Sequence, residues 1–161
     1  MSAVPLPAGR ARSAILWGGL IAGTDDLIFA FAYYGLKLRV FQSVAAGLIG
    51  RDAAFAGGVP TLLLGVALHY LIASIWTALY WLASRRRPVL VKHAVPAGLA
   101  YGLIIFYGMN QLVLPLSALH AKAWPPSLPW GPVAMHMLII GLPIALVVRK
   151  FSREPKMGQT E

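Results

Sequence analysis

The chain of 161 residues is 58% apolar and only 12% charged, whereas an ordinary soluble domain carries about 25% charged residues. Fourteen Lys and Arg and five Asp and Glu residues are too few to cover a water-soluble globule, and the mean hydropathy of +0.70 indicates lipid as the main solvent. The absence of cysteine excludes disulfides, thiolate metal sites and a thiol nucleophile.

The first apolar segment covers residues 13–34 and follows a tail, residues 1–12, whose prolines and glycine predict disorder. A secretory signal peptide is the alternative, because residues 14–23 form a short apolar stretch after two arginines. However, a cut after Gly23 would place Ile21 at the −3 position, where signal peptidase needs a small residue. The apolar pattern also resumes after this point. We therefore predict a membrane-spanning helix.

Two adjacent aspartates, Asp25 and Asp26, lie near the middle of this predicted span. Neighbouring carboxylates in hydrocarbon cannot both be ionised cheaply, so at least one is expected to be protonated near neutral pH. At helical spacing Asp26 shares a stripe with small residues and a GxxxG motif, which is expected to face other helices. That stripe comprises Gly19, Ala22, Gly23, Asp26, Ala30 and Tyr33. A second stripe, expected to face lipid, comprises Leu16, Leu20, Leu27 and Phe31.

Residues 40–58 fit neither a loop nor a span, because they are apolar and rich in Gly and Ala but interrupted by polar side chains. We predict a pair of short helices that lie in the membrane plane or re-enter the membrane, with Asp52 as the N-cap of residues 53–56. Arg51 can pair with Asp52 or extend outward. An interfacial helix without functional content is the alternative.

Three further spans are predicted at residues 59–83, 94–114 and 130–148. Pro115 is expected to end the span at residues 94–114, and Pro143 is expected to kink the span at residues 130–148. The sequence therefore predicts an all-α membrane protein with four transmembrane helices. Residues 13–150 would form one helical membrane domain, followed by a cytoplasmic tail, residues 151–161.

The net charge of +9 reflects basic residues at the ends of apolar segments rather than along one surface, which argues against nucleic acid as a partner. Ten Lys and Arg residues fall on the side of both termini and four on the other. The positive-inside rule then places both termini in the cytoplasm. The lipid bilayer is the expected partner, and glycine-rich faces leave a homo-oligomer open.

Each predicted span carries a polar side chain at a similar depth, about 7 to 15 Å below the outer interface at helical rise. A cluster of these side chains is a candidate site for protons or a small polar ligand, in transport or pH response. The candidate binding residues are Asp25, Asp26, His69, Asn110 and His136, and the secondary candidates are Arg51, Asp52 and Gln111.

Two other functions stay open. The polar residues can serve only as helix clamps in a structural or assembly protein. A metal- or haem-binding enzyme is less well supported, because the two histidines lie on different spans and no metal, hydrolase or nucleotide motif is present. We therefore expect no cofactor and favour a non-enzymatic role.

Four stretches of the chain resemble uncharacterised small bacterial polytopic membrane proteins, distantly of the YagU-like kind. They read LWGGLIAGTDDLIFAF, QSVAAGLIGRDAAFAGG, LGVALHYLIASIWTALYW and GLAYGLIIFYGMNQLVLPLS, and they fall within residues 16–117. The resemblance implies a location in the bacterial inner membrane and hints at acid stress. It implies no catalytic residues, and the last span matches poorly.

Overall fold

The computed structural model describes residues 8–35, 37–121 and 130–152, and within these ranges the chain forms helices and no strand. The described elements are α1 (Ala8–Tyr34), α2 (Arg39–Ile49), α3 (Arg51–Ala56), α4 (Gly58–Arg86), α5 (Val89–Lys92), α6 (Ala94–Gly108), the π-helix η1 (Met109–Val113), α7 (Leu114–Leu116), α8 (Trp130–Met135), the π-helix η2 (His136–Gly141) and α9 (Leu142–Ser152).

Four of these helical stretches are long and apolar enough to cross a membrane. They cover Gly9–Tyr33, Gly58–Arg86, Ala94–Leu116 and Trp130–Ser152. The all-α architecture with four spans that the sequence predicts is thereby confirmed, and it suggests a multi-pass membrane protein.

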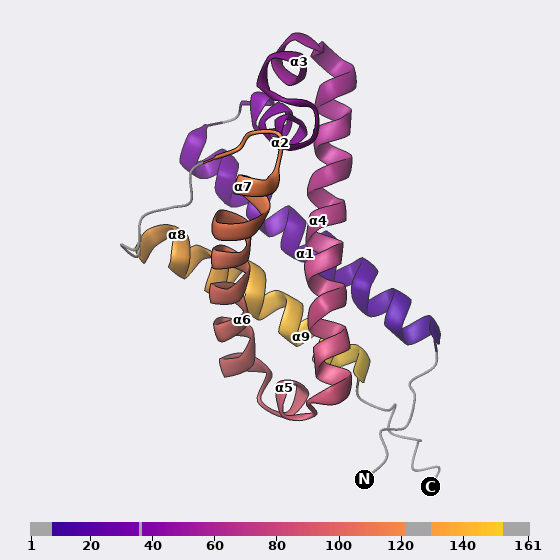
Figure 1. Ribbon diagram of the computed structural model, residues 1–161. Coiled ribbons are helices and arrows are strands. Elements are labelled where there is room, and N and C mark those ends of the chain that lie inside the picture. Colours follow the sequence, from indigo (N-terminus) through magenta and orange to yellow (C-terminus); the bar gives the residue numbers. More distant parts are fainter. Residues whose placement is uncertain (1–7, 36, 122–129, 153–161) are drawn as a thin grey trace, which may run out of the picture.

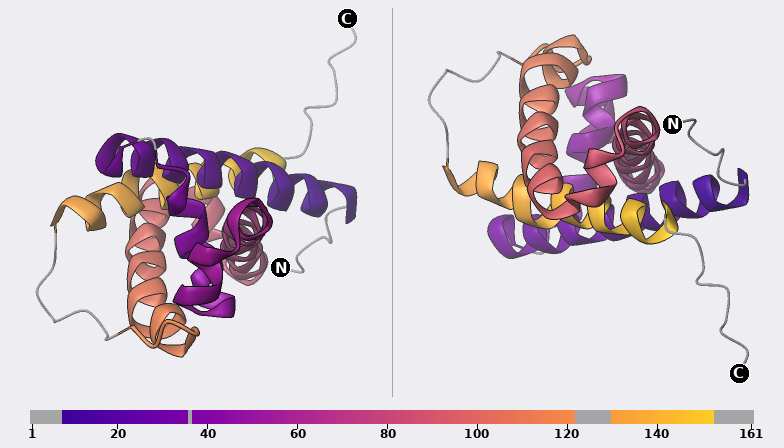
Figure 2. Two further views of the ribbon diagram at one scale, coloured as in Figure 1. Left: turned by 90° about the horizontal axis from the view of Figure 1, so that it is seen from above. Right: turned by 90° about the horizontal axis from the view of Figure 1, so that it is seen from below.

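The four spans form two crossed pairs (Figures 1 and 2). The long helix α4 and the continuous stretch α6–η1–α7 run in opposite directions, and α1 and the stretch α8–η2–α9 run across them, again in opposite directions. The start of α1, the end of α9 and the short helix α5 lie at one end of the molecule, and α2 and α3 lie at the other (Figure 1).

The helix α1 begins at Ala8, so residues 8–12 are helical rather than part of a disordered tail. Alanine and arginine, which fill most of these positions, are strong helix formers, and a proline directly before a helix is well tolerated. The rest of the predicted tail, residues 1–7, lies outside the described residues, as does most of the C-terminal tail, residues 153–161.

The segment between the first two spans forms the predicted pair of short helices, α2 and α3, joined at Gly50. The prediction that Asp52 is an N-cap is wrong, because α3 begins at Arg51, two residues earlier than predicted, and Asp52 lies exposed within its first turn. A carboxylate there still interacts favourably with the helix dipole. The pair is fastened to the start of α4 by Thr61, whose hydroxyl donates to the Ala54 carbonyl at 2.6 Å.

Glycines set the close helix contacts. Along α6, Gly98 and Gly102 meet the backbone around Gly141, so that a Cβ on any of the three would overlap backbone atoms of the other helix. Along α1, Gly19 lies against the backbone of Ser74 of α4 and Gly23 lies against the side chains of Tyr70 and Ala73, so α1 and α4 approach closely, as the GxxxG motif predicts. Both crossings bring polar residues of neighbouring spans toward a common space.

The third span continues through Pro115 to Leu116 instead of ending before the proline. Proline lacks an N–H and its ring clashes with the carbonyl four residues earlier. Each of the two π-helices ends two residues before a proline, η1 before Pro115 and η2 before Pro143. The wider π turn accommodates the proline ring, which explains why these spans change pitch rather than stop.

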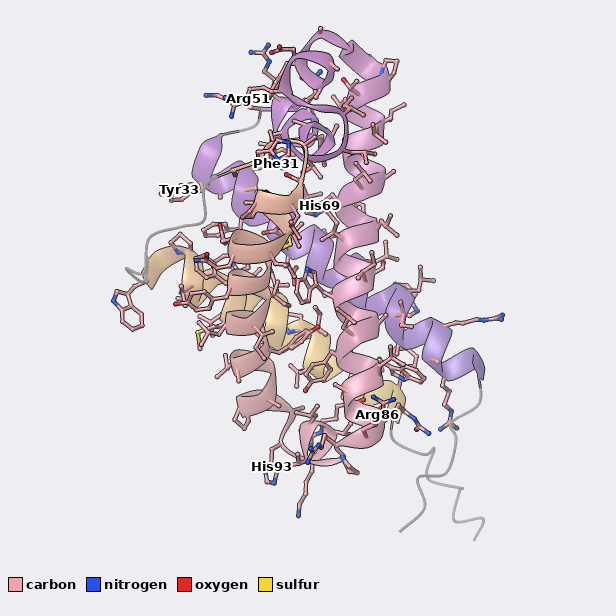
Figure 3. The ribbon with its side chains drawn as sticks, in the orientation of Figure 1. Phe31, Tyr33, Arg51, His69, Arg86 and His93 are labelled. Atoms are coloured by element: carbon pink, nitrogen blue, oxygen red, sulfur yellow. The ribbon has the colours of Figure 1, made fainter. Side chains whose placement is uncertain are left out.

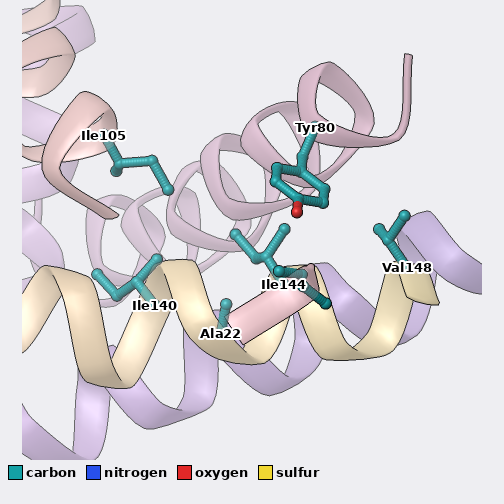
Figure 4. Close-up of a cluster of buried hydrophobic side chains, with 8 residues drawn as sticks. Ala22, Tyr80, Ile105, Ile140, Ile144 and Val148 are labelled. Atoms are coloured by element: carbon teal, nitrogen blue, oxygen red, sulfur yellow. The ribbon is translucent and has the colours of Figure 1, made fainter. Parts of the chain in front are cut away.

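The larger cluster of buried apolar side chains combines residues of α1, α4, α6, η2 and α9 (Figure 4). It includes Tyr80, which is 1% exposed and whose hydroxyl donates to the Leu90 carbonyl at 3.0 Å. Three core residues, Ala22, Ile105 and Ile140, also line the cavity described next. The core therefore forms part of the wall of that cavity.

Candidate functional site

A cavity of about 740 Å³ lies between the four spans. Four of its lining residues have polar side chains that the sequence analysis singles out, and each comes from a different span. They are Asp26 of α1, His69 of α4, Asn110 of η1 and His136 of η2. The structure thus brings together the four residues predicted to lie at similar depth.

Each histidine of the cavity is held through one ring nitrogen by a backbone carbonyl. The Nε2 atom of His69, which extends from α4 toward α1 (Figure 3), donates to the carbonyl of Gly23 at 2.8 Å. The Nδ1 atom of His136 donates to the carbonyl of Pro132 at 2.9 Å. Because a carbonyl can only accept, these bonds leave His69 Nδ1 and His136 Nε2 as the nitrogens with a free lone pair when the rings are neutral.

Asp26 lies close enough to both His69 and His136 for an electrostatic interaction with each. Within the part of the chain that the structure describes, its carboxyl has no hydrogen-bond or salt-bridge partner. Every fully enclosed side-chain nitrogen or oxygen in that part has a hydrogen-bond partner. Because the Asp26 carboxyl has none, its oxygens are not fully enclosed, and they are accessible from the cavity that Asp26 lines. Asn110 donates through Nδ2 to the Phe106 carbonyl at 2.8 Å, which leaves its Oδ1 available.

Aromatic rings complete the walls of the cavity. They belong to Phe29, Tyr33, Trp76 and Phe106. The ring of Phe106 meets that of His136 edge to face at 5.2 Å, and the Trp76 Nε1–H donates to the Met109 sulfur at 3.4 Å. The predicted Asp26 stripe includes Tyr33, but the other three rings were not predicted to lie at the site. Trp76 was detectable, because it lies seven residues after His69 and therefore on the same helix face.

The remaining candidates lie away from the cavity. Asp25 is partly buried but does not line it, because adjacent residues of a helix point about 100° apart. Gln111 is exposed for the same reason on the third span. Arg51 and Asp52 are exposed on α3, and Figure 3 places Arg51 at the opposite end of the molecule from Arg86.

The stripe of α1 that was expected to face lipid does so only in its first half. Leu16 and Leu20 are exposed, whereas Leu27 is only 8% exposed. The ring of Phe31 packs edge to face against Phe41 of α2 at 5.9 Å. The prediction fails there because it considered α1 alone, without the helices that pack against its second half.

A second, apolar cavity of about 410 Å³ adjoins the first, between α2, α4 and the end of the third span. Val44, Ile72, Met109 and Leu114 line both cavities. The two serines that line the second cavity are Ser43 and Ser117, and each hydroxyl donates to a carbonyl three residues earlier in its own turn. The second cavity therefore presents a surface without free donors.

Among the residues that the structure describes, no three His, Cys, Asp or Glu side chains come together as potential ligands of one metal ion. No protein-family model, curated protein or solved structure matches the chain. The resemblance to YagU-like proteins therefore stays a prediction.

Proposed function

We propose that the protein binds protons or a small polar ligand at the cluster of Asp26, His69, Asn110 and His136, in transport or in a response to pH. The observation that carries the proposal is the cavity itself, to which every span contributes one of these side chains. A largely apolar cavity with a few convergent polar groups is typical of ligand sites. Ionisable side chains inside a membrane bundle are typical of proton and solute pathways.

The hydrogen bonds of the cluster support binding over a purely structural clamp. Only the bond from His69 to Gly23 joins two helices. The bonds of Asn110 and His136 go to carbonyls four residues earlier in their own helices. Clamping therefore explains His69 alone and leaves the placement of Asp26, Asn110 and His136 in one cavity without a reason.

We propose further that the protein lies in the bacterial inner membrane with both termini in the cytoplasm, so that the cluster lies in the outer half of the bilayer. Arg85 to Arg87, Lys92, Arg149 and Lys150 flank the spans at the end where α1 begins. Only Lys37, Arg39 and Arg51 lie among the described residues at the other end. This asymmetry supports the orientation through the positive-inside rule.

Carbodiimide labelling tests the proposed protonation at the cluster. The titratable side chains that share the cavity with Asp26 are His69 and His136 from the facing helices and Tyr33 from its own helix. We expect dicyclohexylcarbodiimide, which reacts with protonated carboxyls in apolar surroundings, to label Asp26 of the membrane-embedded protein. The labelling, measured by mass spectrometry, should fall as the pH rises between about 5 and 8.

Asp25→Asn is the matched control, because Asp25 is the neighbouring carboxyl and does not line the cavity. This variant should retain the pH-dependent label, and Asp26→Asn should lose it while eluting as a folded species in size-exclusion chromatography. Labelling of Asp26 that does not change with pH would contradict the proposal. Misfolding of both Asp26→Asn and His69→Ala would instead favour the clamp.

A further inference from the structure

We propose that the ligand of this site is an amphiphilic organic ammonium ion, with its charged head at the polar cluster and its apolar tail in the adjoining cavity. The inference rests on the proposed function and names the chemical class of its ligand. It follows from which hydrogen-bonding positions are free, from the charge of the cavity and from the position of the second cavity directly beside the first.

The free polar positions of the cluster are acceptors. The N–H groups of neutral His69 and His136 are already used by carbonyls, and one N–H of Asn110 is used in the same way. What stays available is the Asp26 carboxyl, one imidazole lone pair on each histidine and the Asn110 Oδ1, with a single remaining amide N–H as donor. A fitting ligand must therefore donate hydrogen bonds, and a primary ammonium group offers three N–H donors.

The charge of the cavity also favours a cationic ligand. Among the described residues no Lys or Arg lines either cavity, and Asp26 is the one Asp or Glu in their linings. A carboxylate without a cationic partner is costly in an apolar environment, and a bound cation supplies that partner. The aromatic rings of Trp76, Phe106 and Phe29 line the same cavity, and the face of an aromatic ring attracts cations through its quadrupole.

The second cavity defines the rest of the ligand. It shares four lining residues with the first, is lined mainly by apolar side chains and offers no free hydrogen-bond donor, so it suits an alkyl or aryl tail attached to the ammonium head. A proton or a small inorganic cation alone would leave this volume unused. When Asp26 is protonated before binding, the ammonium ion displaces that proton, which leaves to bulk water.

Calorimetric titration of the full-length protein in lipid nanodiscs tests the proposal, with n-octylammonium as the probe and empty nanodiscs as the blank. After subtraction of the blank, octylammonium should bind at least about tenfold more tightly than methylammonium, because only the octyl chain reaches the second cavity. Octanoate and 1-octanol, which carry the same tail without a cationic head, should show no saturable binding. Titrations in buffers of different ionisation enthalpy should reveal proton release on binding.

Two pairs of variants separate the head from the tail. Asp26→Asn should weaken octylammonium binding by at least about tenfold, because it removes a charge-assisted hydrogen bond, and Asp25→Asn should leave it unchanged. Gly47→Leu should fill the second cavity and weaken octylammonium binding while leaving methylammonium binding unaltered. Gly47→Ala is its control, because the new Cβ would lie 3.8 Å from the Ser117 Cβ, in ordinary contact.

Absence of saturable octylammonium binding, or equal affinity for octylammonium and octanol, would overturn the inference. If Asp26 is then still labelled by carbodiimide in a pH-dependent way, the proposed function survives without this ligand class. If the pH-dependent labelling is absent as well, the site itself is not functional. The comparison of octyl and methyl chains on the unmodified protein decides the role of the second cavity even if Gly47→Leu does not fold.

Discussion

Replacement of Gly102 by alanine tests whether the crossing of α6 and η2 positions the site. A Cβ on Gly102 would lie 2.6 Å from the carbonyl carbon of His136 and closer still to two other backbone atoms of η2. Ordinary contact begins at 3.4 Å, so the two helices must separate by at least roughly 0.8 Å. Because the obstacle is backbone, no side-chain rotation relieves it.

The expected cost follows from two opposing effects. Overpacking of this kind costs about 1–3 kcal/mol, and the higher helix propensity of alanine returns about 0.5–1 kcal/mol. We therefore expect the free energy of unfolding to fall by about 0.5–2 kcal/mol, measured by titration with sodium dodecyl sulfate in mixed micelles. Octylammonium binding should also weaken, because the shift displaces His136.

Gly131→Ala is the matched control for the stability measurement. Gly131 lies in the first turn of the fourth span, and a Cβ there would meet no atom within 4 Å. It should be neutral or stabilise by up to about 1 kcal/mol through helix propensity. If Gly102→Ala proves as stable as Gly131→Ala, the crossing is not held by backbone contact and the reasoning fails.

Two further predictions concern stability away from the cavity. Tyr80→Phe should lower the free energy of unfolding by about 1–3 kcal/mol, because it leaves the Leu90 carbonyl without its 3.0 Å bond, and an unchanged unfolding curve would refute that role. Gly50→Ala should cost about 1–3 kcal/mol, since Gly50 has φ +82° and ψ 161°, a conformation that is nearly restricted to glycine. A Cβ there would meet nothing within 4 Å, so this cost is backbone strain alone, and equal thermal stability of Gly50→Ala and Gly131→Ala would contradict it.

The spans were predictable from the sequence because hydropathy is a sum over about twenty residues, and no tertiary contact is needed to recognise it. The inward direction of Asp26 was also predictable, because the GxxxG stripe beside it identifies the face that approaches another helix. By contrast, the contact of Phe31 with Phe41 depends on α2, which follows later in the chain. A pattern confined to α1 contains no information about it.

The second cavity was equally invisible in the sequence. Its lining combines α2 with α4 and with the end of the third span, so it exists only because three segments distant in sequence meet. Residues such as Leu68 and Val113 look like ordinary lipid-facing apolar residues when each span is read by itself. The size and chemistry of a ligand therefore had to come from the structure, although the polar residues that would hold its head were apparent beforehand.

The two π-helices link a local sequence feature, the proline, to the chemistry of the cavity. Each precedes a proline, and the proline is visible in the sequence, but the change of pitch upstream of it is not. Carbonyl oxygens in the turn before a π-helix can accept a hydrogen bond from a side chain, because each has two lone pairs. Asn110 and His136 stand at the starts of η1 and η2 and donate to such carbonyls, those of Phe106 and Pro132. The donors of both side chains are thereby drawn to the backbone, which explains why the polar groups left to the cavity are mainly acceptors.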